Sequence, residues 1–258
     1  MAVVGLIAAG TVVAISGSSS TTSSSPAISR TAARFLQASL NAARRAGSFH
    51  YVSNFTSQGS TQHTVGDAGP DSGRQVITIG SHSFTVLVIG TACYFQGDAN
   101  TMVAQLGVSA AAATSHAGQW IALAPSDGPY QSVYAAVTAP SALSDNIAFK
   151  PQHDLGTSTV GTRSVQSIGG AMTNFSASGQ TQQARGTAEF DAAVARPHVP
   201  VRYVERGVIN GQQADFTMTF SHWGERVGIV APPGALSFSS LSAGTPGPSG
   251  PPGSTTLI

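Results

Sequence analysis

The stretch Phe216-Thr-Met-Thr-Phe-Ser-His-Trp-Gly224 decides the fold class. It places large apolar side chains at Phe216, Met218 and Phe220, separates them with threonines, and then reaches a turn at Gly224. Because successive side chains of a strand point to opposite faces, this period of two predicts a β-strand with one buried face.

The same alternation, or a denser apolar run bounded by glycine turns, recurs along most of the chain. We expect strands at residues 49–55, 75–79, 84–89, 92–96, 119–123, 187–194, 201–208, 216–220 and 227–230. Turns such as Gly80-Ser81 and Gly90-Thr91 are too short to contain a crossover helix, so neighbouring strands should run antiparallel.

A helical period appears at residues 30–46, in a stripe flanked by Phe35 and Ser39 and formed by Ala33, Leu36, Leu40 and Ala43. Ser29 and Gly47 can cap this helix. Short helices are expected in an insert at 98–117, and another at 129–137. The order of elements predicts a single α+β domain with one strongly curved antiparallel sheet and helices packed on its concave side.

The two ends of the chain differ in composition from the middle. Residues 1–16 include the apolar run Ala2–Ile15, which is short for a hydrocarbon core of ~30 Å and suits a signal or anchor segment for export. Residues 17–28 form a Ser/Thr-rich linker, residues 29–240 the folded domain, and residues 241–258 a disordered Pro/Gly-rich tail. We therefore expect an extracytoplasmic cell-envelope protein, either secreted or associated with the membrane through an uncleaved first segment.

Ile15-Ser16-Gly17-Ser18 resembles a bacterial lipobox, except that Ser18 stands where the lipidated cysteine belongs. A serine has no thiol for a thioether, so lipid attachment at this position is not expected. Cleavage after Ser16 by an ordinary signal peptidase is the alternative, since Ala14 and Ser16 fit a small-x-small site.

Composition excludes several classes of function. Only 9% of the residues are charged and the net charge is +1, so no basic stripe can follow a nucleic acid. Cys93 is the single cysteine, which rules out an intrachain disulfide and a cysteine-based metal site. We expect no metal, no cofactor and a monomer.

Taken in order, several motifs resemble the actinobacterial LppX/LprAFG lipoprotein family, whose fold is related to the LolA-type carriers. They are Cys93-Tyr94-Phe95, Gly118-Gln-Trp-Ile-Ala-Leu123, Val199-Pro-Val-Arg-Tyr203, Phe216–Gly224 and Val230-Ala-Pro232. The resemblance covers most of residues 29–240. It implies a half-barrel sheet closed on one side by helices, with acyl chains held inside in some members.

No catalytic motif emerges from the sequence, and we expect no enzyme. There is no Gly-x-Ser-x-Gly, no His-Glu-x-x-His and no phosphate-binding Gly-rich loop, and the seven histidines include no pair four residues apart. His222 should lie at a solvent-facing turn. Trp223 should pack on the sheet rim and Trp120 in the core.

The apolar side of the predicted sheet is the proposed ligand site. Its residues are Phe49, Tyr51, Phe55, Phe84, Val86, Val88, Tyr94, Phe190, Tyr203, Phe216, Met218 and Phe220. Small residues among them would leave room for an alkyl chain, whose burial needs no directional partner. We expect carriage or presentation of a lipid or other apolar ligand, with the insert at 98–117 as a mobile lid. The alternative is a ligand-free interaction module whose interior is filled by its own side chains.

Overall fold

The computed structural model describes residues 9–10, 26–135, 137–147, 149–177 and 180–242. Six helices are assigned within this part of the chain: α1 Pro26–Ala46, α2 Ala99–Leu106, α3 Ala110–His116, α4 Tyr130–Tyr134, α5 Ala139–Asn146 and α6 Phe238–Ser242. A small sheet joins β1 Ala9–Gly10, β10 Phe175–Ala177 and β11 Gln180–Gln182.

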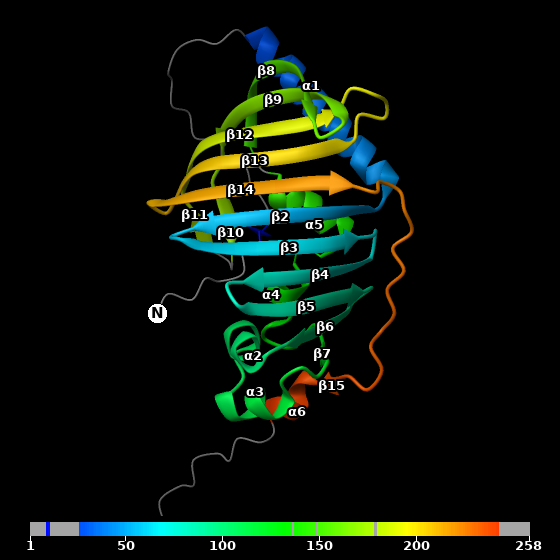
Figure 1. The fold of residues 1–258 in the computed structure, drawn as a ribbon, viewed down its shortest axis with the longest axis vertical. Coiled ribbons are helices and arrows are strands. Elements are labelled where there is room, and N and C mark those ends of the chain that lie inside the picture. The colour runs from blue at the N-terminus through cyan, green and yellow to red at the C-terminus, as the bar shows by residue number, and fades with distance from the viewer. Residues whose placement is uncertain (1–8, 11–25, 136, 148, 178–179, 243–258) are drawn as a thin grey trace, which may run out of the picture.

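A twelve-stranded sheet forms the body of the protein, in the order β15-β7-β6-β5-β4-β3-β2-β14-β13-β12-β9-β8. Its strands are β2 Phe49–Ser57, β3 Ser60–Ala68, β4 Ser72–Ile79, β5 His82–Ile89, β6 Ala92–Gly97, β7 Ile121–Leu123, β8 Phe149–Val160, β9 Arg163–Met172, β12 Ala184–Ala193, β13 Pro200–Ile209, β14 Gln212–Ser221 and β15 Leu236–Ser237. All neighbours are antiparallel except the short parallel pair β15 and β7. The sheet curves without closing, and α1, α4 and α5 lie on its concave side (Figure 1). The predicted fold class is confirmed.

Four strands of the large sheet, β3, β8, β9 and the two-residue β15, were missing from the sequence prediction, as were the three short strands of the small sheet. One predicted strand is absent. β3, β8 and β9 carry few large apolar residues, so their alternation is weak in the sequence. The predicted strand at 227–230 lies in an extended connection without regular structure. β14 already pairs with β13 on one side and β2 on the other, so the chain that follows it has no free strand edge there.

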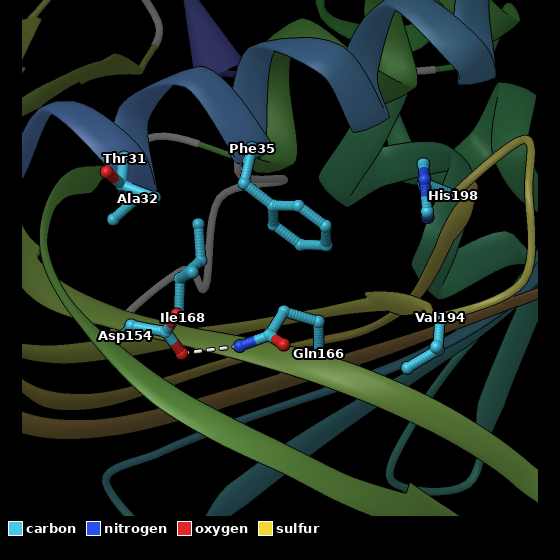
Figure 2. A pocket seen from close by; sticks show the side chains of 8 residues that line it. All are labelled: Thr31, Ala32, Phe35, Asp154, Gln166, Ile168, Val194 and His198. Atoms are coloured by element: carbon cyan, nitrogen blue, oxygen red, sulfur yellow. Dashed lines mark hydrogen bonds between the residues drawn. The ribbon is translucent and has the colours of Figure 1, made fainter.

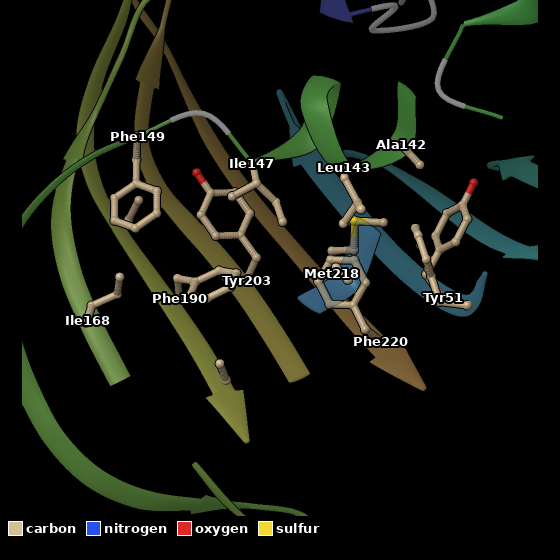
Figure 3. Packing of buried hydrophobic residues seen from close by; sticks show 14 of the residues in the cluster. Tyr51, Ala142, Leu143, Ile147, Phe149, Ile168, Phe190, Tyr203, Met218 and Phe220 are labelled. Carbon is tan, nitrogen blue, oxygen red and sulfur yellow. The ribbon is translucent and has the colours of Figure 1, made fainter. Parts of the chain in front are cut away.

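Two buried clusters line the concave face of the one sheet. The first lies over β2, β14, β13, β12 and β9 beneath α1 and α5, and Figure 3 shows Phe190, Tyr203, Met218 and Phe220 packed within it. The second lies over β4–β7 beneath α2–α4. β3 separates them because it offers small residues: Tyr51 covers Gly66 so closely that a Cβ there would lie 2.3 Å from the Tyr51 Cζ.

The predicted helix at 30–46 is α1, which begins four residues earlier at Pro26 and ends at Ala46 as expected. Gly47 caps it in a left-handed conformation, and its N–H donates to the Ala43 carbonyl oxygen at 3.2 Å. The buried stripe is shifted from the prediction at its start. Ala32 is 1% exposed, whereas Ala33 faces solvent.

The expected lid at 98–117 is anchored to the core. Its helices α2 and α3 bury Met102, Leu106 and Ala113 in the second cluster. Asp98 caps α2 by accepting from the Thr101 N–H at 2.7 Å. This anchoring is hard to predict from the sequence, because Met102 and Leu106 are only two large side chains among many small ones, and both point inward.

Candidate functional site

A pocket of about 280 Å³ lies on the concave side, between α1 and the β8–β9 end of the sheet. Figure 2 shows its walls: Thr31, Ala32 and Phe35 come from α1, Asp154, Gln166 and Ile168 from β8 and β9, and Val194 and His198 from the connection between β12 and β13. This volume is near the lower end of the ~300–1,000 Å³ typical of small-ligand sites.

The body of the pocket is apolar. Phe35 projects from α1 toward the sheet, and Ile168 rises from β9 on the other side (Figure 2). Ala32 leaves the space between them open because its side chain is a single methyl group. Val194 is 44% exposed, so an apolar side chain also stands where the pocket meets solvent.

The rim of the pocket is polar and held in place by hydrogen bonds. Asp154 Oδ1 accepts from the Gly156 N–H at 2.7 Å and from the Gln166 side-chain amide. His198 Nδ1 lies 3.0 Å from the Ala193 carbonyl oxygen, so this nitrogen carries the hydrogen and donates it. His198 has φ of 59°, an uncommon conformation for a residue other than glycine, which the surrounding loop must enforce.

Eleven of the twelve predicted site residues share the concave face, as the strand registers show. Phe55 lies opposite Phe216, and Tyr51 lies opposite Phe220. Met218 and Phe190 both lie opposite Tyr203. Phe84, Val86 and Val88 of β5 lie on the same face as these residues, because the residues opposite them in β4 and β3 lead back to the inward-facing positions of β2. Val88 is connected in this way to Phe49.

Tyr94 is the exception. Its neighbours Cys93 and Phe95 are buried in the second cluster at 1% and 0% exposure, so Tyr94 points to the opposite face and is half-buried. Cys93-Tyr94-Phe95 is apolar throughout, and such a run gives no sign of which alternate residues face inward. Phe95 occupies the place that the prediction gave to Tyr94.

Side chains fill much of the predicted ligand site. Nine of the twelve residues are no more than 3% exposed; Phe55 and Phe216 are half-buried. None of the twelve lines the 280 Å³ pocket. The pocket floor does adjoin them, because Ile168 lies directly opposite Phe190 in the sheet. None of the eight lining residues was among the predicted site residues. In the sequence, Phe35 was noted only as flanking the predicted helical stripe, Val194 only as the end of a predicted strand, and His198 only as one of the seven histidines.

The aromatic and thiol side chains singled out in the sequence have structural positions. Trp223 is half-buried, its ring centroid lies 4.8 Å from that of Phe49, and its Nε1–H donates to the Pro200 carbonyl oxygen at 3.0 Å. Trp120 is half-buried rather than enclosed in the core. His222 is exposed at a turn, as predicted. Cys93 is buried, and burial raises the pKa of its thiol to about 12.

The described residues offer neither a membrane-spanning helix nor a metal-binding cluster. No helix in the described ranges combines the length and the apolar character needed to cross a membrane. The expected export segment Ala2–Ile15 lies outside the described residues apart from Ala9–Gly10. Across the part of the chain that the structure describes, no three His, Cys, Asp or Glu residues are grouped so as to hold a metal ion.

Comparison with solved structures supports the fold. No family model and no curated protein matches the chain. Among solved structures, LprF from Mycobacterium bovis is similar at 15% identity and a TM-score of 0.51, over 80% of this chain and 98% of that one. The lipoprotein LppX from Mycobacterium tuberculosis matches at 16% identity and a TM-score of 0.48, over 78% and 99%. The chain therefore has an LprF-like fold, as the sequence motifs indicated.

Proposed function

We propose that this is an exported cell-envelope protein that binds the alkyl chain of a lipid between α1 and the β8–β9 end of its sheet, for carriage or presentation. The observation that carries this proposal is the pocket itself, which is apolar within and polar at its rim. The LprF-like fold supports it, as does the apolar run Ala2–Ile15, which suits export. An apolar chain gains about 0.8 kcal/mol for each buried CH2 group without any directional partner.

The predicted interior residues enter this proposal as the path for a longer chain. A row of directly opposite residues crosses the four neighbouring strands β9, β12, β13 and β14, from the pocket floor into the first cluster: Ile168, Phe190, Tyr203 and Met218. On α1, Ser39 is fully buried, and its Oγ has no hydrogen-bond partner among the described residues. A buried hydroxyl without a partner costs about 1–3 kcal/mol, which a ligand oxygen or a water would relieve.

Filling the pocket should abolish binding of an acyl probe. Replacing Thr31→Trp places a large ring at the pocket wall from an exposed position on α1, and Ala33→Trp adds the same ring to the solvent face of that helix. We expect Thr31→Trp to weaken the binding of parinaric acid, a fluorescent C18 chain, at least tenfold, which corresponds to about 1.4 kcal/mol. Ala33→Trp should bind within twofold of the unmodified protein, as measured by fluorescence titration.

Each result of that titration has a meaning for the proposal. Binding that survives in Thr31→Trp would move the ligand away from this pocket. An unmodified protein that fails to bind the probe, and whose organic extract contains no acyl species, would favour the ligand-free interaction module with a filled core.

Ser18 gives an independent prediction about the membrane. We expect no diacylglyceryl group on the protein in its native host, because Ser18 lacks the thiol. Intact mass measurement of membrane-extracted protein should show no added acyl mass, and Ser18→Cys should gain it. An acyl mass on the unmodified chain, or none on Ser18→Cys, would mean that the lipobox resemblance is accidental.

A further inference from the structure

A second pocket, of about 250 Å³, lies at the end of β2, β3 and β4 on the other side of the sheet. His50, Asp67 and Arg74 lie directly opposite one another in these three strands. They alternate with Phe49 and Ala68, which belong to the first cluster, so their side chains point to the convex face. The pocket is therefore separate from the one beneath α1.

The other wall of this pocket is the connection 222–235 that follows β14, visible in Figure 1 as the long orange trace along the strand ends. Trp223 fixes its start by packing on Phe49 and Phe220. The Gly224 N–H donates to the Ser48 carbonyl oxygen at 2.9 Å, and Ser48 Oγ donates to the Glu225 carbonyl oxygen at 2.5 Å. These contacts hold His222, Glu225 and Arg226 against the strands.

The connection keeps polar groups available beside the pocket. Within the described residues, the backbone of 226–229 forms no hydrogen bond, although these residues line the pocket. Backbone N–H groups without a partner in the protein are free to donate to a ligand in the pocket.

The side chains of the pocket combine both signs of charge. Arg74 and Arg226 form no ion pair with any described residue, although two carboxylates share the pocket with them. Asp67 is engaged by His50, whose Nδ1 lies 2.7 Å from the Asp67 Oδ1. His222 adds a second imidazole, 5.6 Å from His50 between ring centroids. Glu225 completes the set from the connection.

We propose that this cleft is a second binding site, for a phosphate-type oxyanion that carries neighbouring hydroxyl groups. Arginine guanidinium groups donate in pairs to phosphate oxygens, and imidazole nitrogens add further donors. The carboxylates of Asp67 and Glu225 can accept from hydroxyls next to the oxyanion. The same chemistry occurs in a soluble polyol phosphate and in the head group of an anionic phospholipid. The site stands independently of the acyl pocket, because it uses other residues on the opposite face of the sheet.

Titration calorimetry with glycerol 3-phosphate tests the proposal on the full chain. The unmodified protein should bind it more tightly than glycerol or inorganic phosphate, because only the ester offers both the oxyanion and the hydroxyls. The double variant Arg74→Gln/Arg226→Gln should bind at least tenfold more weakly. Arg163→Gln, which removes the exposed arginine at the start of β9, is the control and should bind within twofold.

Vesicles distinguish the two sources of the ligand. Cosedimentation with phosphatidylglycerol vesicles that Arg74→Gln/Arg226→Gln abolishes, and Arg163→Gln does not, would assign the site to a lipid head group; binding of glycerol 3-phosphate alone would assign it to a soluble ester. Absence of binding to both probes would overturn the proposal. If the double variant and Arg163→Gln weakened binding of the probes equally, the proposal would also be overturned, because attraction to the overall positive charge of the protein would then explain the binding. An unchanged melting temperature shows that the variants are folded.

Discussion

Replacing Arg202→Met should lower the free energy of unfolding by about 3 to 5 kcal/mol, the largest single effect that we expect outside the apolar core. Arg202 donates through Nε to Asp191 Oδ2 at 2.6 Å and through an Nη to Glu189 Oε1 at 2.6 Å. Asp191 is 0% exposed, and its other oxygen accepts from Ser167 Oγ at 2.5 Å. Methionine keeps most of the side-chain bulk but leaves the buried Asp191 carboxylate without a countercharge.

Two further variants show whether the buried charge causes this loss. Glu189→Gln removes the half-exposed partner and should cost less than about 1 kcal/mol, because water already screens that contact. The double variant Asp191→Asn/Arg202→Met removes both buried charges and should recover much of the stability lost in Arg202→Met. Denaturant unfolding measures all three. If the double variant were as unstable as Arg202→Met, lost packing rather than an uncompensated charge would explain the effect.

The group formed by Arg202, Asp191 and Glu189 shows what an alternating sequence pattern can predict about burial and what it cannot. Glu189 and Asp191 alternate with Ala188 and Phe190, which correctly placed the carboxylates on the side opposite the cluster. Alternation implied that this side faces water. Burial of Asp191 depends on Ser167 and Arg202 from neighbouring strands, and pairing between distant strands leaves no local mark in the sequence.

The site itself was less predictable than the fold. Phe190, Tyr203 and Met218 were correctly assigned to the concave face, because each strand carries its own period. Whether such residues pack on one another or surround a space depends on how closely α1 approaches the sheet. The pocket opens where Ala32 of α1 faces Ile168 of β9. All residues of β9 from Val165 to Met172 are buried or half-buried, so no alternation between a buried and an exposed face marks Ile168 as a residue of the pocket. The LprF-like arrangement came from the order of several motifs, none of which was specific alone.

A second large effect should appear as a dependence of stability on pH. Glu205 lies on the concave face, opposite Ala188 in β12 and Phe216 in β14. Burial raises the pKa of its carboxyl group from 4.5 to about 7, although the Tyr203 hydroxyl, which donates to Glu205 Oε1 at 2.5 Å, opposes this rise. Between about pH 4.5 and pH 7 the folded chain therefore binds one more proton at this position than the unfolded chain does.

Stability should consequently fall as the pH rises through this range, and the penalty is fully present above pH 7. The loss in the free energy of unfolding above pH 7 is at most about 3 kcal/mol, and partial exposure of the carboxyl group should reduce this loss to about 1–2 kcal/mol. Glu205→Gln keeps the acceptor for Tyr203 and stays uncharged, so we expect it to be more stable than the unmodified protein at pH 8 and equal to it near pH 4.5. Denaturant unfolding at several pH values, with the exposed Glu225→Gln as control, measures the difference. Parallel stability profiles for the two proteins would show that Glu205 is ionised in the folded state without cost, and that water reaches the concave face beside Phe216.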